Sequence, residues 1–299
     1  MRWPILNKCL RRKARIAYGR RKVAHETWIA LLSRYCCISV AFLRVRDVSR
    51  SGLITCMLCA FVAHPTGAAA QYREALWGVV QVCRLNYEVT GRAFPCLSVN
   101  LSEGVERGYV ILSPPSDDRD LILAPTRKIV GVEDASIEAV DAPNYFDDAW
   151  KARATLAARG HAPPRRDEVA LAVNSSLARS QDQLHIHIGC ISEEAKKSIE
   201  AIEPDLSPTR WRLLTTPIGG VIFWARTIVQ DTLAGINPFR LAAKELPMAG
   251  EDRRNMTIVV VGIPSAQGRD GFVLLAAIDD RFGPGFSEAG TALLGQSCP

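Results

Sequence analysis

The chain has 299 residues, enough for one large domain or two small domains with a hydrophobic core. Its formal net charge is +6, but residues 1–50 hold 13 of the 37 basic side chains and only two acidic ones, so the rest of the chain is mildly acidic. A nucleic-acid-binding surface is therefore not expected on the body of the protein.

A basic arm and an apolar segment open the chain. The arm covers residues 1–50, and a start codon placed too early would equally account for it. An apolar run at 53–63 follows three arginines and precedes the small residues 68–70, the order typical of a secretory signal. We predict a signal peptide or amino-terminal membrane anchor at 51–70, with a buried core helix as the alternative. Residues 71–299 would then form an exported domain, associated with the inner membrane or periplasmic.

Four cysteines remain in the exported part: Cys83, Cys96, Cys190 and Cys298. An even number in an oxidising compartment favours disulfides, for which three pairings are possible. Only a short loop with Gly91 and Pro95 separates Cys83 from Cys96, so we predict the bridges Cys83–Cys96 and Cys190–Cys298. Four free buried thiols are the alternative, if the domain stays in the cytoplasm.

Hydrophobic periodicity predicts an α+β fold with an antiparallel sheet and packed helices. In the first half, strands and helices alternate up to a predicted helix at 193–202, with Asn144 capping one of the helices. The second half is expected to extend or cover the same sheet, and no repeat is clear enough to indicate a duplication. The expected helices are 75–87, 144–159, 193–202 and 238–246, and the expected strands are 109–112, 120–124, 168–174, 183–190, 256–263 and 271–278, with a hairpin at 211–227.

The strand at 183–190 carries the most informative pattern. Leu184, Ile186 and Ile188 alternate with polar residues, so His185 and His187 project side by side from one face. Two neighbouring histidines are consistent with a nucleophile and a phosphate-binding partner, with a polar face without chemistry, or with a metal site that takes its third ligand from His161.

Other phosphate-binding groups cluster around this strand. Asn174 ends the preceding strand, Ser180 lies in the connecting loop, and Gln183 shares the histidine face. Amide, hydroxyl and imidazole groups all hydrogen-bond phosphate oxygens, and carboxylates are few on this face. An anionic substrate is therefore favoured over a metal, and no cofactor is demanded by these residues.

The constellation resembles the histidine-triad superfamily, and the match to the CDP-diacylglycerol diphosphatase family is closer. The resemblance runs from about residue 76 to 298, with a histidine-triad-like core at about 105–192 and an elaboration at 193–299. The segments that carry it are Leu123-Ala124-Pro125-Thr126, Pro143-Asn144-Tyr145-Phe146, Ala170-Leu171-Ala172-Val173-Asn174-Ser175, Arg179-Ser180-Gln181, His185-Ile186-His187-Ile188 and Asn237-Pro238-Phe239.

The resemblance implies hydrolysis of CDP-diacylglycerol, a membrane lipid, to CMP and phosphatidate at the inner-membrane surface. It assigns the nucleophile to His185 and the third triad position to His187, whereas Gln183 replaces the first histidine. It also implies that Asn174 and Ser180 contact phosphate, and Arg127 is expected to meet the diphosphate.

A neutral imidazole attacks phosphorus without prior deprotonation, so we expect the other ring nitrogen of His185 to donate to a backbone carbonyl and fix the tautomer. Two alternatives remain open. One is a histidine-triad hydrolase or nucleotidyl transferase that acts on another nucleotide, and the other is a noncatalytic nucleotide- or lipid-binding module.

Overall fold

The computed structural model describes residues 72–114, 120–159, 164–246, 253–264, 270–279 and 290–295. The predicted basic arm, the export segment at 51–70, His161 and Cys298 lie outside the described residues. In the part of the chain that the structure describes, no helix combines the length and apolar character needed to cross a membrane.

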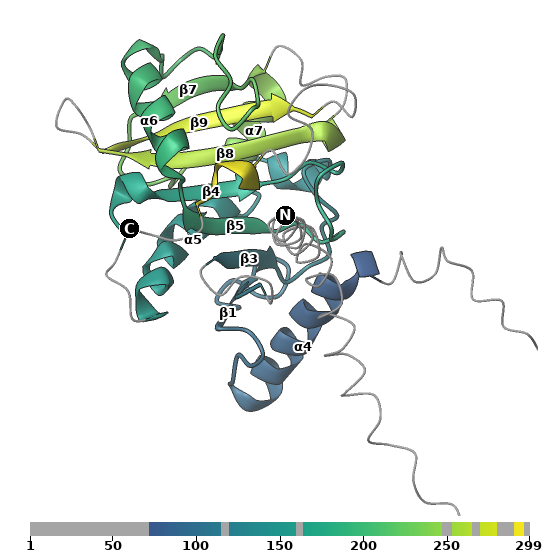
Figure 1. Ribbon diagram of the computed structural model, residues 1–299. Coiled ribbons are helices and arrows are strands. Elements are labelled where there is room, and N and C mark those ends of the chain that lie inside the picture. Colours follow the sequence, from purple (N-terminus) through teal and green to yellow (C-terminus); the bar gives the residue numbers. More distant parts are fainter. Residues whose placement is uncertain are drawn as a thin grey trace, which may run out of the picture. The chain divides into compact units, whose positions relative to one another are not determined.

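One antiparallel sheet of nine strands organises the domain, as the α+β prediction requires (Figure 1). Its spatial order is β1-β2-β3-β5-β4-β8-β9-β7-β6. The strands are β1 Ser98–Asn100, β2 Tyr109–Leu112, β3 Leu121–Pro125, β4 Val169–Val173, β5 Ile186–Cys190, β6 Arg212–Leu213, β7 Trp224–Ile228, β8 Met256–Ile263 and β9 Gly271–Ile278.

Helices lie close to their predicted positions. The α-helices are α4 Ala75–Thr90, α5 Tyr145–Ala152, α6 Glu193–Ile202 and α7 Pro238–Glu245. Asn144 caps α5 by accepting from the Asp147 amide at 3.3 Å, as its side chain predicts. The α-helix ends sooner than expected, because the chain continues from Ala152 as a 3₁₀-helix. The 3₁₀-helices are η1 Ala135–Glu138, η2 Arg153–Arg159, η3 Arg166–Glu168, η4 Glu203–Asp205, η5 Arg253–Asn255 and η6 Thr291–Leu293.

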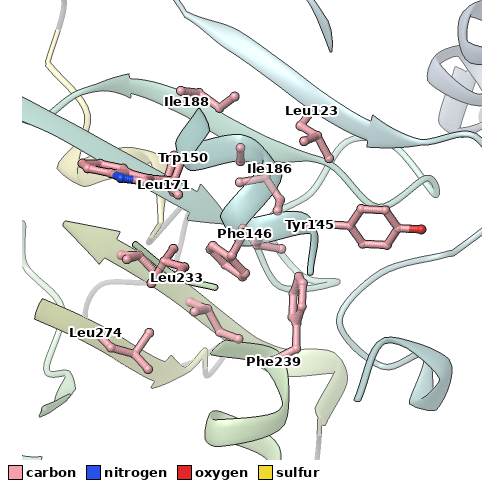
Figure 2. Packing of buried hydrophobic residues seen from close by; sticks show 14 of the residues in the cluster. Leu123, Tyr145, Phe146, Trp150, Leu171, Ile186, Ile188, Leu233, Phe239 and Leu274 are labelled. Atoms are coloured by element: carbon pink, nitrogen blue, oxygen red, sulfur yellow. The ribbon is translucent and has the colours of Figure 1, made fainter. Parts of the chain in front are cut away.

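The two faces of the sheet are packed differently. One face buries a single large cluster that includes Leu123, Leu171 and Ile186 together with the apolar side chains of α5 and α7 (Figure 2). The other face has two separate clusters: α4 covers the β1–β3 end, and α6 and η6 cover the β8–β9 end. Strand β5 lies between β3 and β4, so its second face falls between these two clusters.

The second half of the domain repeats the topology of the first, which the sequence pattern did not reveal. Strands β2 to β5 are arranged as hairpin, helix α5 and hairpin, in the spatial order β2-β3-β5-β4. Strands β6 to β9 follow the same sequence of elements around α7, in the order β6-β7-β9-β8. The two units meet at the antiparallel pair β4–β8, so the second half is a repeat of this topology rather than an unrelated elaboration.

The registers of the strands make the two units equivalent residue by residue. Strands β3 and β7 have five residues each, and laying one on the other places Ile122 on Ala225. Their partners across the next ladder are His187 and Leu275, so these two positions correspond. One ladder further, the same reasoning equates Ala172 with Val259, and these two residues pair directly with each other. A pseudo-twofold axis therefore passes between Ala172 and Val259.

The helices obey the same pseudo-symmetry. Asn144 caps α5 and Asn237 caps α7, and each asparagine also donates across to the other unit: Asn144 to the Leu233 and Ile236 carbonyls before α7, and Asn237 to the Ile137 carbonyl in η1. Two residues after each cap come Phe146 and Phe239, whose ring centroids lie 4.8 Å apart in the shared core (Figure 2). Equivalent side chains thus pack against each other across the axis, as in a symmetric dimer joined into one chain.

Candidate functional site

The two histidines lie where the sequence predicts, on one face of the middle of the sheet. His187 is paired with Ile122 of β3 and Ala172 of β4, and His185 immediately precedes β5. The two imidazole centroids are 5.0 Å apart, with the rings inclined at 65°. His185 is buried and His187 is partly exposed. His187 is therefore the more exposed of the two imidazoles, and His185 keeps 7% of its surface exposed.

One ring nitrogen of His185 is held by the backbone. Its Nδ1 lies 2.7 Å from the carbonyl oxygen of Gln183, and a carbonyl only accepts, so Nδ1 carries the hydrogen and donates. The expected tautomer is thereby present. In the neutral ring, Nε2 then has the free lone pair, which is the state required of a nucleophile.

The surroundings keep both imidazoles neutral. Burial is the main cause that lowers the pKa of His185, and the positive charge of Arg179 lowers it further, against the bond to the Gln183 carbonyl. Burial also lowers the pKa of His187 to about 3, and His185 adds to this effect. Neither ring is expected to carry a charge at neutral pH, so His187 can act as a neutral donor but not as a cation.

The side chain of Gln183 is bonded to the backbone of the 125–129 segment. Both hydrogens of Nε2 are used, in 3.0 Å bonds to the carbonyl oxygens of Pro125 and Arg127. The amide oxygen accepts from the Ile129 amide at 3.4 Å, and the side chain is fully buried. Gln183 therefore fixes the 125–129 segment beside His185 and has no free donor for a substrate.

Asn174 is also committed to contacts within the chain. Its Oδ1 accepts from the amides of Gly290 and Thr291 at 3.1 and 3.3 Å, and its Nδ2 donates to the Thr291 hydroxyl at 3.3 Å. The side chain thus holds the segment that contains η6 against the end of β4. The long bond to Thr291 is the one that a phosphate oxygen could replace.

Ser180 and Arg127 differ in how well they fit their expected roles. Ser180 is exposed in the loop before His185, where a ligand can reach its hydroxyl. Arg127 donates from Nη2 to the Ser136 hydroxyl at 2.7 Å, and its charge acts on Tyr145, which belongs to the core of the opposite face. Only the carbonyl of Arg127 is tied to the histidine loop, through Gln183.

A buried cation beside His185 was not assigned a role from the sequence. Arg179 donates to both oxygens of Glu133 at 2.7 and 2.6 Å, and its Nε bonds Asp182 at 3.2 Å. Asp182 in turn accepts two 2.6 Å bonds from Arg73, two residues before α4. Arg179 occurs in the motif Arg179-Ser180-Gln181, but its partner Glu133 lies 46 residues away, so spacing alone could not identify the pair.

The first predicted disulfide is present, since Cys83 of α4 is bonded to Cys96. Cys190, at the end of the histidine strand, is also disulfide-bonded. Because Cys298 lies outside the described residues, the pairing Cys190–Cys298 stays a prediction.

No group of three or more histidine, cysteine or acidic side chains suited to a metal ion occurs among the residues that the structure describes. What this site offers chemically is a neutral imidazole with a fixed tautomer, a second neutral imidazole beside it, and a buried guanidinium close by. A neutral imidazole with a free ring nitrogen is the form of histidine that can attack phosphorus.

Comparison with known proteins assigns the chain to a family. A family model described as CDP-diacylglycerol pyrophosphatase matches residues 71–299. CDP-diacylglycerol pyrophosphatase of Yersinia pestis is 33% identical over 204 residues, which are 68% of this chain and 76% of the relative. The protein of the same name from Mycobacterium bovis is 30% identical over 242 residues, covering 78% of this chain and 89% of the relative. The chain therefore belongs to the CDP-diacylglycerol pyrophosphatase family.

Proposed function

We propose that this hydrolase cleaves the diphosphate of CDP-diacylglycerol to CMP and phosphatidate through a covalent nucleotidyl-histidine on His185. Family membership supports the substrate and the reaction class. The observation that carries the mechanism is the 2.7 Å bond between His185 Nδ1 and the Gln183 carbonyl, because it leaves Nε2 as the nucleophilic atom.

In the first step, Nε2 of neutral His185 attacks the cytidine-side phosphorus. The new N–P bond forms as the bond from phosphorus to the bridging oxygen breaks, and phosphatidate leaves with that electron pair. The ring becomes positively charged, and its Nδ1 hydrogen remains donated to the Gln183 carbonyl. That bond to the ring strengthens as the charge develops, so it favours the transition state over the ground state.

In the second step, water attacks the same phosphorus and the N–P bond breaks. Nε2 regains its electron pair, the water proton passes to solvent, and CMP departs. His187 and the exposed Ser180 hydroxyl would donate to the phosphoryl oxygens during both steps. Each preorganised donor of this kind stabilises the transition state by about 3 kcal/mol.

The test is release of CMP and phosphatidate from CDP-diacylglycerol in mixed micelles, with a chelator present. With cytidine-labelled substrate and the slow variant His187→Ala, acid-labile label should be trapped on the protein at His185. In ¹⁸O-water the heavy atom should enter CMP, because water attacks the cytidine-side phosphorus. Label in phosphatidate instead, or full activity in His185→Ala, would refute the covalent route.

The same assay separates the alternative substrates. CDP-choline or a dinucleotide in place of the lipid tests for a hydrolase that recognises the nucleotide alone. Cleavage of these compounds as fast as of CDP-diacylglycerol would reassign the protein to a general nucleotide hydrolase.

We also propose that residues 71–299 act outside the cytoplasm. The predicted signal at 51–70 and the disulfide Cys83–Cys96 support this, since such bonds persist in oxidising compartments. An alkaline phosphatase fusion after residue 80 should be active, whereas activity restricted to cytoplasmic reporters would contradict export.

A further inference from the structure

Helix α4 has two apolar sides, but the sheet uses only one of them. Leu76, Val80 and Cys83 are buried against the β1–β3 end of the sheet. On the outward side, Val82, Leu85 and Val89 are 53%, 50% and 81% exposed. These three residues follow the spacing i, i+3 and i+7, so they form one continuous stripe.

The loop after α4 carries two more exposed apolar side chains. Phe94 is 70% exposed and Leu97 is 48% exposed. The loop is fixed to the helix by the Cys83–Cys96 disulfide and by the bond from Asn86 to the Phe94 carbonyl at 2.8 Å. Half of the ten exposed large apolar residues in the described structure therefore lie between residues 82 and 97, in a rigid element. We refer to Val82, Leu85, Val89, Phe94 and Leu97 as the α4 apolar surface.

This surface is connected to the histidine site. The Leu76 amide donates to the Gln181 side chain at 2.8 Å, and Asp182 is bonded to the side chain and carbonyl of Arg73. These contacts bind the start of α4 to the loop directly before His185. In addition, the charged residues Arg84 and Glu88 of α4 pair with each other at 3.0 Å, which reduces the cost of bringing the helix to an apolar medium.

We propose that the α4 apolar surface docks onto the phospholipid bilayer and holds the histidine loop beside the lipid headgroups. This rests on the proposed function, because only a lipid substrate requires the site to lie at a bilayer. The chain itself favours this occupant, since the apolar run at 53–63, predicted to be a signal or membrane anchor, ends twelve residues before α4 begins. Amphipathic elements of this kind lie in the interfacial plane, and their binding grows with the buried apolar area.

Hydrogen exchange of the full chain tests the docking itself. Vesicles of phosphatidylcholine and phosphatidylglycerol, without CDP-diacylglycerol, should slow exchange in peptides that span 82–97 and leave those around Val229 unchanged. Equal exchange with and without vesicles would overturn the proposal. Without vesicles, exchange in these peptides that slows as the protein concentration rises would also overturn the proposal, and would assign the surface to a second copy of the chain.

Activity measurements separate docking from chemistry. Val89→Asp combined with Phe94→Ser should lower hydrolysis of CDP-diacylglycerol in vesicles about tenfold, and leave hydrolysis of a short-chain, monomerically dispersed analogue unchanged. Val229→Asp, at a residue of 52% exposure far along the chain, is the matched control and should lower neither rate. Loss of both rates in the double variant alone would contradict docking, whereas an inactive parent protein would refute the proposed function instead.

Discussion

The two halves of the sheet are equivalent in architecture and different in chemistry. Each has two hairpins around a helix that is capped by asparagine, and the equivalent residues Phe146 and Phe239 meet in one core. The strand positions of His185 and His187 correspond to Val273 and Leu275, which are fully buried in the cluster under α6 and η6. The comparison teaches that both halves contribute to one core, whereas only the first carries the histidines on which the proposed chemistry rests.

The largest effect is expected from a substitution at His185, compared with the same substitution at its equivalent, Val273. His185→Ala should lower CMP release by at least about a thousandfold, because it removes the atom that bonds phosphorus. Val273→Ala, at the equivalent position of the second half, should lower stability without abolishing activity of the folded protein. Parallel rate measurements on both variants check this, and similar losses would mean that the two halves share the site.

The next prediction concerns stability, to which the equivalent residues Phe146 and Phe239 of the two halves should contribute alike. Phe146→Ala and Phe239→Ala should each destabilise the protein by about 3–5 kcal/mol, because each leaves a cavity in the shared core. Denaturant unfolding gives both values. Because the rings contact each other, the double variant should cost less than the sum of the single ones. Strict additivity would show that the two helices pack independently.

A smaller effect is expected at Gln183, whose equivalent in the second half is Gly271. Gln183→Leu should cost about 2 kcal/mol of stability, because the carbonyls of Pro125 and Arg127 lose their donors in a buried environment. The pH dependence of the residual activity should keep its shape, since Gln183 positions the loop and binds no substrate. A selective rise in KM with unchanged stability would instead restore the phosphate-binding role.

The smallest expected effect is a loss of folding stability in acid, which comes from the imidazoles of the first half. The folded-state pKa of His187 is lowered to about 3, so below the unfolded value of 6.5 the unfolded chain binds more protons than the folded one. Stability should therefore fall by about 1 kcal/mol as the pH drops from 6.5 to 5.5, and His187→Gln should remove this loss.

Urea unfolding of both proteins across this pH range provides the measurement. Other groups cancel in the difference, including Asp148, whose pKa burial raises to about 6. Identical pH profiles for the two proteins would contradict a depressed His187 pKa.

The local prediction succeeded where a short range of sequence carries the signal. Alternation of Leu184, Ile186 and Ile188 with polar residues defined the histidine face, and the Asn144 side chain defined the start of α5. The roles of polar side chains were harder to predict. Gln183 was assigned to a phosphate, but its partners at 125–129 are more than fifty residues away, and the ion pair of Arg179 with Glu133 is similarly remote.

The amino-acid sequence by itself determined most of the helices and strands, the pair of histidines and the resemblance to the family, because periodicity and motifs act over a few residues. Strand β1 (Ser98–Asn100) was not expected from the sequence. Only the tertiary structure decided the repeat, because the equivalence of the two halves lies in the order and pairing of their strands, and few identical residues mark it in the sequence. It also decided that the polar groups around His185 support the loop, since a buried donor must bond whichever acceptor the fold brings within reach.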